Sequence, residues 1–420
     1  MQVVSTTRAA LAPEREIRRL PLLAMLSANA ISGAGNALAR LAIPWFVLET
    51  TGSAARTGLV GAVEVLPLVI AGLFGGTLVD RVGFRRMSVV SDFASGATVA
   101  VIPALYFTVG LAFWQLLLLV FAGALLDAPG QTARRSFVPE LADEAGVALP
   151  SANGYFEAIS RSTGLVGPPI AGVLIAVFGA APLLWINAGT FVISAALMMF
   201  LVPARLEPEP DPSELRATYL SDLVAGFRWI RQDVLIRTLI AMILVTNLIE
   251  APMMLVLLVY AREVYDSAVA LGVLIGVFSV GAILGSIISG AVTARVPGRW
   301  IFPLGFSVVV LFYGALLGEP PFLVVLAVAA LTGVVAGPMN PVLSTVFQER
   351  VPPRMRGRVF GLRSALMMSA APLGILAGGV IIGAAGFRTM LVIQLCAMSL
   401  AVLWMVLSPT LRDLRVGMRG

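Results

Sequence analysis

Twelve apolar stretches of about twenty residues or more follow one another along this chain. Each is long enough to cross a bilayer as a helix, since a helical span needs roughly 20 mostly apolar residues. We predict helices over residues 20–48, 55–78, 88–110, 112–134, 151–177, 181–203, 235–261, 268–293, 300–318, 322–346, 358–384 and 387–408. Only 12% of the 420 residues are charged, about half the share in soluble domains. The sequence therefore predicts an all-α membrane protein with twelve transmembrane helices.

The arginines predict how these helices are oriented. Basic residues concentrate in the cytoplasmic connections of membrane proteins. All 29 basic residues are arginine, and 24 of them fall in the two terminal segments and the connections on the same side. The opposite connections hold only Arg56, Arg262 and Arg388. We therefore expect a multi-pass protein of the bacterial cytoplasmic (inner) membrane with both termini in the cytoplasm, and no removable signal peptide.

The composition excludes several kinds of chemistry. The chain has no histidine, and Cys396 is its only cysteine. Imidazole proton relays, histidine-bound metals and disulfides are therefore excluded, and we expect no metal and no cofactor. Membrane orientation explains the basic residues better than nucleic acid does, so no nucleic-acid partner is predicted. Any proton chemistry must use carboxylates.

The chain divides into two similar halves. Residues 207–212 alternate acidic residues with proline, and the apolar positions of 219–231 have the spacing of an interfacial helix on the cytoplasmic face. Residues 204–234 are thus a predicted cytoplasmic linker between six-helix bundles at 20–203 and 235–408, with an N-terminal cytoplasmic segment at 1–19 and a tail at 409–420. Residues 53–83 align without gaps on 267–297, which indicates a duplication. Two six-helix halves related by duplication are the arrangement of one large class of transporters, in which the substrate site lies between the halves near the membrane midplane.

A polar stripe marks the first span. Charged groups in a bilayer usually face a cavity or a partner, because each costs at least about 2.5 kcal/mol there. Asn29, Ser32, Asn36 and Arg40 recur at spacings of three and four residues, so they share one helix face and are predicted to line the substrate cavity. Arg40 and Glu64 lie at similar depth and could form an ion pair, either as a structural link or as one that substrate or a proton breaks.

Glu250 lies near the middle of the seventh span, and no arginine of the second half lies at comparable depth. The repeat places it opposite Asn36 of the first span. Burial without a partner disfavours the charged form of a carboxylate. Glu250, with Glu64 as a second candidate, is therefore the predicted proton-coupling residue and a cavity residue. A merely hydrogen-bonded buried acid is the alternative.

Two further groups of residues can be explained by structural roles alone. Asp127, Glu157 and Arg161 lie at a common depth on neighbouring spans, and we interpret them as a structural charge cluster. Several methionines and aromatic residues either line an adaptable pocket or simply pack helices: Met253, Met254, Met367, Met368, Trp45 and Phe278.

The connection after the second span carries a recognisable motif. Residues 75–86 read GGTLVDRVGFRR, which closely resembles the Gly-x-Leu-Ala-Asp-Arg-x-Gly-Arg-Arg signature of the major facilitator superfamily. Small residues permit close helix approach and tight turns, an aspartate accepts from a helix N-terminus or an arginine, and arginines hold lipid phosphates. The resemblance implies a gate that involves Gly76, Asp80, Arg81, Gly83, Arg85 and Arg86. In the family this aspartate latches the cytoplasmic side against the start of the eleventh span, here near residues 358–363.

The fifth span carries a second motif. Residues 164–172 read GLVGPPIAG, which resembles the Gly-Pro-x-x-Gly-Gly antiporter motif of proton-driven drug exporters through Gly164, Gly167, Pro168 and Gly172. The same residues could instead mark only a kink or close helix packing. Residues 127–141, 152–153 and 347–361 also resemble the branch that holds macrolide-efflux proteins and the enterobactin exporter. The resemblance covers nearly all of residues 20–408.

Together these features predict a secondary active exporter and not an enzyme, with no catalytic residues. The resemblance implies proton-coupled antiport of bulky amphipathic or lipophilic small molecules, a multidrug function, by alternating access in a monomer surrounded by membrane lipids. A dedicated exporter of a siderophore, secondary metabolite or lysolipid is the alternative. A solute importer fits the fifth-span motif less well.

Overall fold

The computed structural model describes residues 17–206, 227–352 and 355–412, and all regular elements in these ranges are helices. The first half contains α1 (Leu20–Thr51), α2 (Ala54–Val82), α3 (Phe84–Phe107), α4 (Phe113–Ser136), α5 (Val138–Glu144), α6 (Leu149–Phe178), α7 (Ala180–Leu201) and the 3-10 helix η1 (Ala204–Leu206). The second half contains α9 (Val234–Glu250), α10 (Met253–Val264), α11 (Ala268–Ile287), α12 (Ser289–Arg295), α13 (Gly298–Leu317), α14 (Phe322–Ala336), α15 (Met339–Arg350), α16 (Arg356–Leu407) and α17 (Pro409–Arg412).

These helices make twelve spans. Ten helical stretches of the described chain are long and apolar enough to cross a membrane. One of them, 369–407, is two spans, because the chain reverses at Gly386, whose φ of 81° few other residues adopt. The long helix α2 is the remaining span and packs against α4 and α16. The predicted all-α, twelve-span architecture is confirmed.

Local sequence sets where the spans begin and break. The side chains of Ser53 and Ser267, which the repeat aligns, each accept a backbone N–H from the first turn of α2 or α11. Pro252 separates α9 from α10 within the seventh span, because proline lacks the N–H that would continue the ladder. Most of the predicted interfacial helix lies outside the described residues. In its described part, residues 227–232 are helical.

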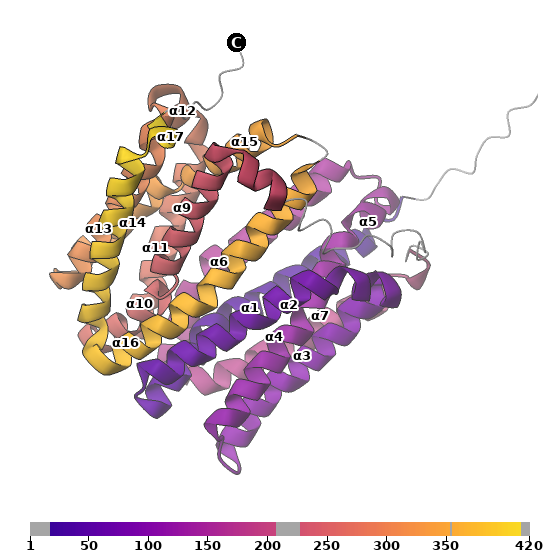
Figure 1. Cartoon of the computed structure of the whole chain (residues 1–420). Helices are drawn as coiled ribbons and strands as arrows, with labels where there is room; N and C mark the ends of the chain where they lie inside the picture. Colours follow the sequence, from indigo (N-terminus) through magenta and orange to yellow (C-terminus); the bar gives the residue numbers. More distant parts are fainter. Residues whose placement is uncertain (1–16, 207–226, 353–354, 413–420) are drawn as a thin grey trace, which may run out of the picture.

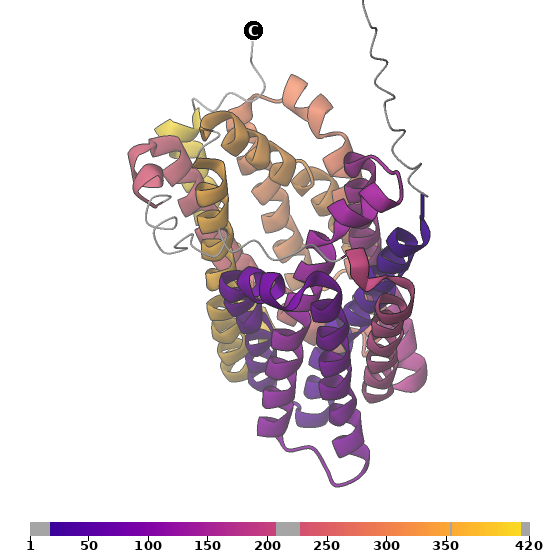
Figure 2. The ribbon, with the colours of Figure 1, turned by 90° about the vertical axis from the view of Figure 1, so that its right-hand side faces the viewer.

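The two halves meet at one end of the molecule and diverge toward the other (Figures 1 and 2). We call the end with α5, η1, α15 and α17 the linker end, and the end with the α1–α2 turn the loop end. At the loop end α2 packs on α16 and α6 on α11. A Cβ atom on Gly58 would lie 2.8 Å from the Cα of Gly379. The halves therefore touch backbone to backbone there, so the loop end is closed.

Candidate functional site

A cavity of about 1190 Å³ lies along the inner face of the second half. Its walls come from α9, α10, α11, α13, α14 and α15, with α6 of the first half opposite. Four of the residues singled out in the sequence line it, namely Met253, Met254, Phe278 and Met367. Trp45 does not, because it is buried at the loop end beneath the guanidinium of Arg262, which lies 5.8 Å from its ring. The side chain of Met368 is outside the described residues. The wall is predominantly apolar and adaptable.

Glu250 is the one carboxylate in that lining and the last residue of α9. Among the described residues it makes no hydrogen bond and no ion pair. Two groups beside it are also incomplete. The Tyr313 hydroxyl, from α13, is buried without a hydrogen-bond partner. Gln394 of α16 donates from Nε2 to the carbonyl of Ile249 at 2.8 Å, but its Oε1 is buried without a partner.

A second cavity, of about 350 Å³, lies inside the first six-helix bundle. The structure brings together here five predicted cavity residues: Asn29, Ser32, Asn36, Arg40 and Glu64. Glu250 is not among them, because it lies in the other half. The sequence predicted one cavity for these six residues, whereas the structure divides them between two. Arg40 and Glu64 line the same cavity without an ion pair within 4.0 Å in the part of the chain described.

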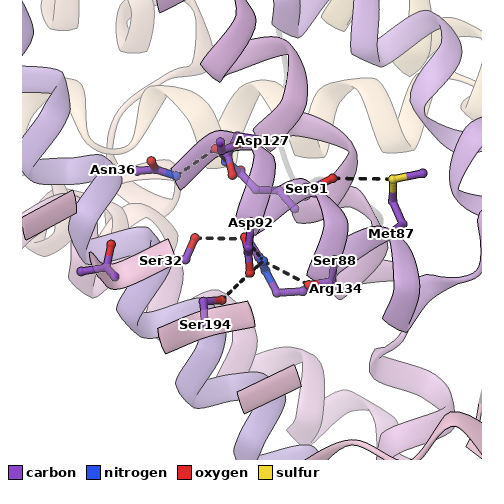
Figure 3. Close-up of polar contacts among 12 residues, drawn as sticks. Ser32, Asn36, Met87, Ser88, Ser91, Asp92, Asp127, Arg134 and Ser194 are labelled. Atoms are coloured by element: carbon purple, nitrogen blue, oxygen red, sulfur yellow. Dashed lines mark hydrogen bonds and ion pairs between the residues drawn. The ribbon is translucent and has the colours of Figure 1, made fainter. Parts of the chain in front are cut away.

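A buried ion pair beside this second cavity was not predicted. Arg134 Nη1 lies 2.9 Å from both carboxylate oxygens of Asp92, and the two side chains are 1% and 0% exposed (Figure 3). Arg134 also donates to Ser88 and Ser32, and Ser194 donates to Asp92. Arg134 is the last residue of the predicted span 112–134 and was counted among the arginines of the cytoplasmic connections. The signal that could have found the pair is the polar spacing of Ser88, Ser91, Asp92 and Ser95 along the third span.

The predicted cluster of Asp127, Glu157 and Arg161 is wrong for one member. Glu157 pairs with Arg135 and with Arg161, the latter at 4.0 Å. Asp127 faces the second cavity instead, where Oδ2 accepts from Asn36 at 2.9 Å and from Gln131 at 2.6 Å (Figure 3). Asp127 and Gln131 are one turn apart on α4 and share a face of it, and the helix is rotated so that this face lines the second cavity.

The motif after the second span surrounds the turn between α2 and α3. Gly83 makes that turn with a φ of 92°. Arg85 donates to the carbonyl of Met199 at 2.6 Å, which ties the start of α3 to α7. Arg81 and Arg86 are exposed. The side chain of Asp80 and the surroundings of Gly76 lie outside the described residues, and so do the side chains of residues 358 and 361 in the segment 358–363, where the latch partner was expected.

The motif of the fifth span lies where α6 contacts both α1 of its own half and α11 of the second half. Gly167 packs on Ala37 of α1, and the Pro168 carbonyl lies against Gly272 of α11. A Cβ on Gly172 would lie 2.5 Å from the Ala268 carbonyl oxygen, whereas Gly164 has open space around it. Three of the four motif residues therefore form close contacts, and two of them lie at the junction of the halves.

Comparison with known proteins gives the family. The sequence matches the profile of the Major Facilitator Superfamily over residues 25–270 and 238–417. This chain belongs to the major facilitator superfamily. It is 35% identical to the multidrug efflux pump Tap of Mycolicibacterium fortuitum, over 94% of this chain and 98% of that protein. It is 23% identical to macrolide efflux protein A of Streptococcus pyogenes, over 85% and 88% of the two chains.

Solved structures give the same fold. A bacterial homologue of the lysosomal transporter Spinster, crystallised inward-facing and unoccupied, superposes with a TM-score of 0.71. The superposition covers 95% of this chain and 98% of that chain at 16% identity. At this identity the likeness concerns the fold alone.

Proposed function

We propose that this protein exports bulky amphipathic compounds across the bacterial cytoplasmic membrane in exchange for protons. The observation that carries the proposal is the cavity of about 1190 Å³, whose mainly apolar wall holds one carboxylate, Glu250. An apolar body and a cationic group would both find a place there. The relatives named as multidrug and macrolide efflux proteins support export of such compounds.

Alternating access is the proposed mechanism. The arginine distribution assigns the linker end to the cytoplasm, with both termini there. The closed loop end then faces outward, and the cavity receives substrate from the inside. The halves meet at the loop end through glycines such as Gly58 and Gly379. Such contacts separate without breaking ion pairs, so a monomer in a lipid bilayer can rock open there.

Proton coupling is proposed to act at Glu250 by competition. A proton entering from outside neutralises the carboxylate and releases a bound cation, and loss of the proton to the cytoplasm restores the charge. When one proton enters for each monovalent cation that leaves, no net charge crosses the membrane and the pH gradient drives the exchange. The membrane potential adds roughly 2.3 kcal/mol per 100 mV only for each further proton that enters. Glu64 is the second candidate proton site. The motifs around Asp80 and Pro168 are proposed to gate the cytoplasmic side and to seal the outer junction.

The test uses energised inverted vesicles and a pH-sensitive dye. Lipophilic cations, macrolides and siderophores are added in turn, and proton release is followed in the wild type and in Glu250→Gln. Release by many unrelated cations in the wild type, and its loss in the variant, is expected. Release by one compound that no other competes with would favour a dedicated exporter. If none of the panel releases protons, the proposed function is overturned.

A further inference from the structure

A break in the seventh span brings several oxygen atoms together inside the second half. The helix α9 ends at Glu250, and Pro252 starts α10. The carbonyl of Ile249 receives its hydrogen bond from the Gln394 side chain instead of from a following turn. The C-terminal end of a helix carries a partial negative charge. The Glu250 carboxylate adds a full one at the same place.

Two polar groups around this break have no hydrogen-bond partner among the described residues. Tyr313 and Gln394 are each 1% exposed, yet the tyrosine hydroxyl and the glutamine Oε1 have no partner. Tyr313 lines the cavity together with Glu250, and the two interact electrostatically. Buried polar groups in proteins almost always have partners, so each exception asks for an explanation.

At the corresponding position of the first half, the polar side chain has a partner within the protein. The repeat places Asn36 opposite Glu250, and the Asn36 amide donates to Asp127 at 2.9 Å. Among the described residues, no amide or arginine contacts Glu250. Arg161 is the one arginine in the lining of its cavity, and it pairs with Glu157 on its own helix. A ligand that carries N–H donors would complete the groups of the second half.

The chemistry of these groups specifies what the ligand carries. Carboxylate and hydroxyl oxygens can both accept hydrogen bonds, and the negative helix end favours a cation. Met253, Phe306 and Phe312 line the same cavity and offer apolar surface. We propose that the break between α9 and α10 binds the protonated amine of a substrate, with Glu250 and Tyr313 accepting its N–H groups. Gln394 is a positioning residue that holds the Ile249 carbonyl and hence the break. This inference rests on the proposed export function and names the substrate class.

The test is binding to the purified full-length protein in detergent. Dansylcadaverine, a fluorescent primary amine, is compared with its N,N,N-trimethyl derivative, which carries the same charge but no N–H on that nitrogen. Tyr313→Phe removes only a hydroxyl. It should weaken binding of the primary amine about tenfold, which is about 1.4 kcal/mol, and change binding of the trimethyl derivative less than twofold. Glu250→Gln should weaken both at least tenfold.

A matched control keeps the result interpretable. Tyr260 is a buried tyrosine of the same half that does not line the cavity, and its hydroxyl pairs with that of Tyr265. Tyr260→Phe should leave both affinities unchanged, and thermal unfolding of each variant shows that it folds. Equal losses for both probes in Tyr313→Phe, or no loss for the primary amine, overturn the assignment.

Two further outcomes distinguish an amine from an inorganic cation as the ligand, and failure of the site inference from failure of the export function. Replacement of choline chloride by sodium chloride should not displace the amine; competitive displacement in the wild type that disappears in Glu250→Gln would assign the site to an inorganic cation. If vesicles export the panel while no amine binds at Glu250, the site inference fails and the export function stands. If no compound is exported, the function fails whatever binds.

Discussion

The two halves of the molecule, which the sequence repeat relates, hold three of their carboxylates differently. A fourth, Glu64 of the first half, lines the smaller cavity without an ion pair among the described residues. In the first half, Asp92 is paired with Arg134, and Asp127 accepts from two amides. In the second half, Glu250 has neither an arginine nor an amide partner among the described residues. The cavities differ accordingly, at about 350 Å³ in the first half and 1190 Å³ in the second.

This difference separates charges that hold helices together from a charge that can bind a ligand. A charge that the protein itself neutralises holds helices together, here α3, α4 and α7 through Asp92, Arg134 and Ser194. A charge left without a partner beside a large apolar cavity is available to a ligand. The first half should therefore respond to mutation mainly through stability, and the second half mainly through substrate affinity.

The largest expected effect is on the stability of the first half. Arg134→Met leaves the Asp92 carboxylate buried without its partner, which should lower the free energy of unfolding by about 3–5 kcal/mol. Chemical unfolding of the full-length protein in detergent measures it. The matched control is Arg135→Gln, one residue along, whose pair with Glu157 is largely exposed and worth about 0–1 kcal/mol. Similar losses for the two variants would contradict the contrast.

The sequence predicted the spans well, because a bilayer demands long apolar helices and the arginines fall between them on one side. The absence of an arginine for Glu250 was also readable, since no arginine of that half lies at its depth. The Asp92–Arg134 pair and the true partners of Asp127 were missed for a common reason. Position along a span gives the depth of a side chain, but its partner depends on how each helix is rotated toward its neighbours.

Positions at the junction of the halves were predictable only as motifs. The residues around Gly167 and Pro168 were identified by resemblance, with close packing as the alternative. The contacts of Gly58 with Gly379, and of Arg262 with Trp45, join residues far apart in the sequence. Only the docking of the two bundles determines such pairs.

A smaller effect than that of Arg134→Met is expected at Glu250, and it concerns the free energy of substrate binding. Glu250→Gln removes no protein partner and avoids burying an unpaired charge, so the free energy of unfolding should not fall. Affinity for a cationic substrate should nevertheless fall at least tenfold, or about 1.4 kcal/mol. Asp127→Asn is the counterpart in the first half and should leave that affinity within about twofold. Paired unfolding and binding curves decide between this pattern and the reverse, which would refute the division of roles.

The smallest effect is expected at the junction of the halves. Three arginines lie near the loop end, and each contacts its own half: Arg56 lies over Phe113, and Arg388 pairs with Glu319. Arg262 pairs with Asp266 of its own half and, unlike the other two, also lies over a side chain of the other half, Trp45. Arg262→Gln should remove a cation–π contact worth about 0.5–1 kcal/mol and shift the equilibrium between open and closed loop ends by about two- to fivefold.

Spin labels at the linker end measure this shift. Cysteines at the exposed positions Ser136 and Ala294, in a Cys396→Ser background, report the distance between α4 and α12. Opening of the loop end brings the linker ends together, so Arg262→Gln should raise the population at short distance. Arg56→Gln removes a similar contact within one half and should leave the distance distribution unchanged. If both variants shift it alike, the Arg262 contact has no special role in holding the halves together, and the effect belongs to loop-end charge in general.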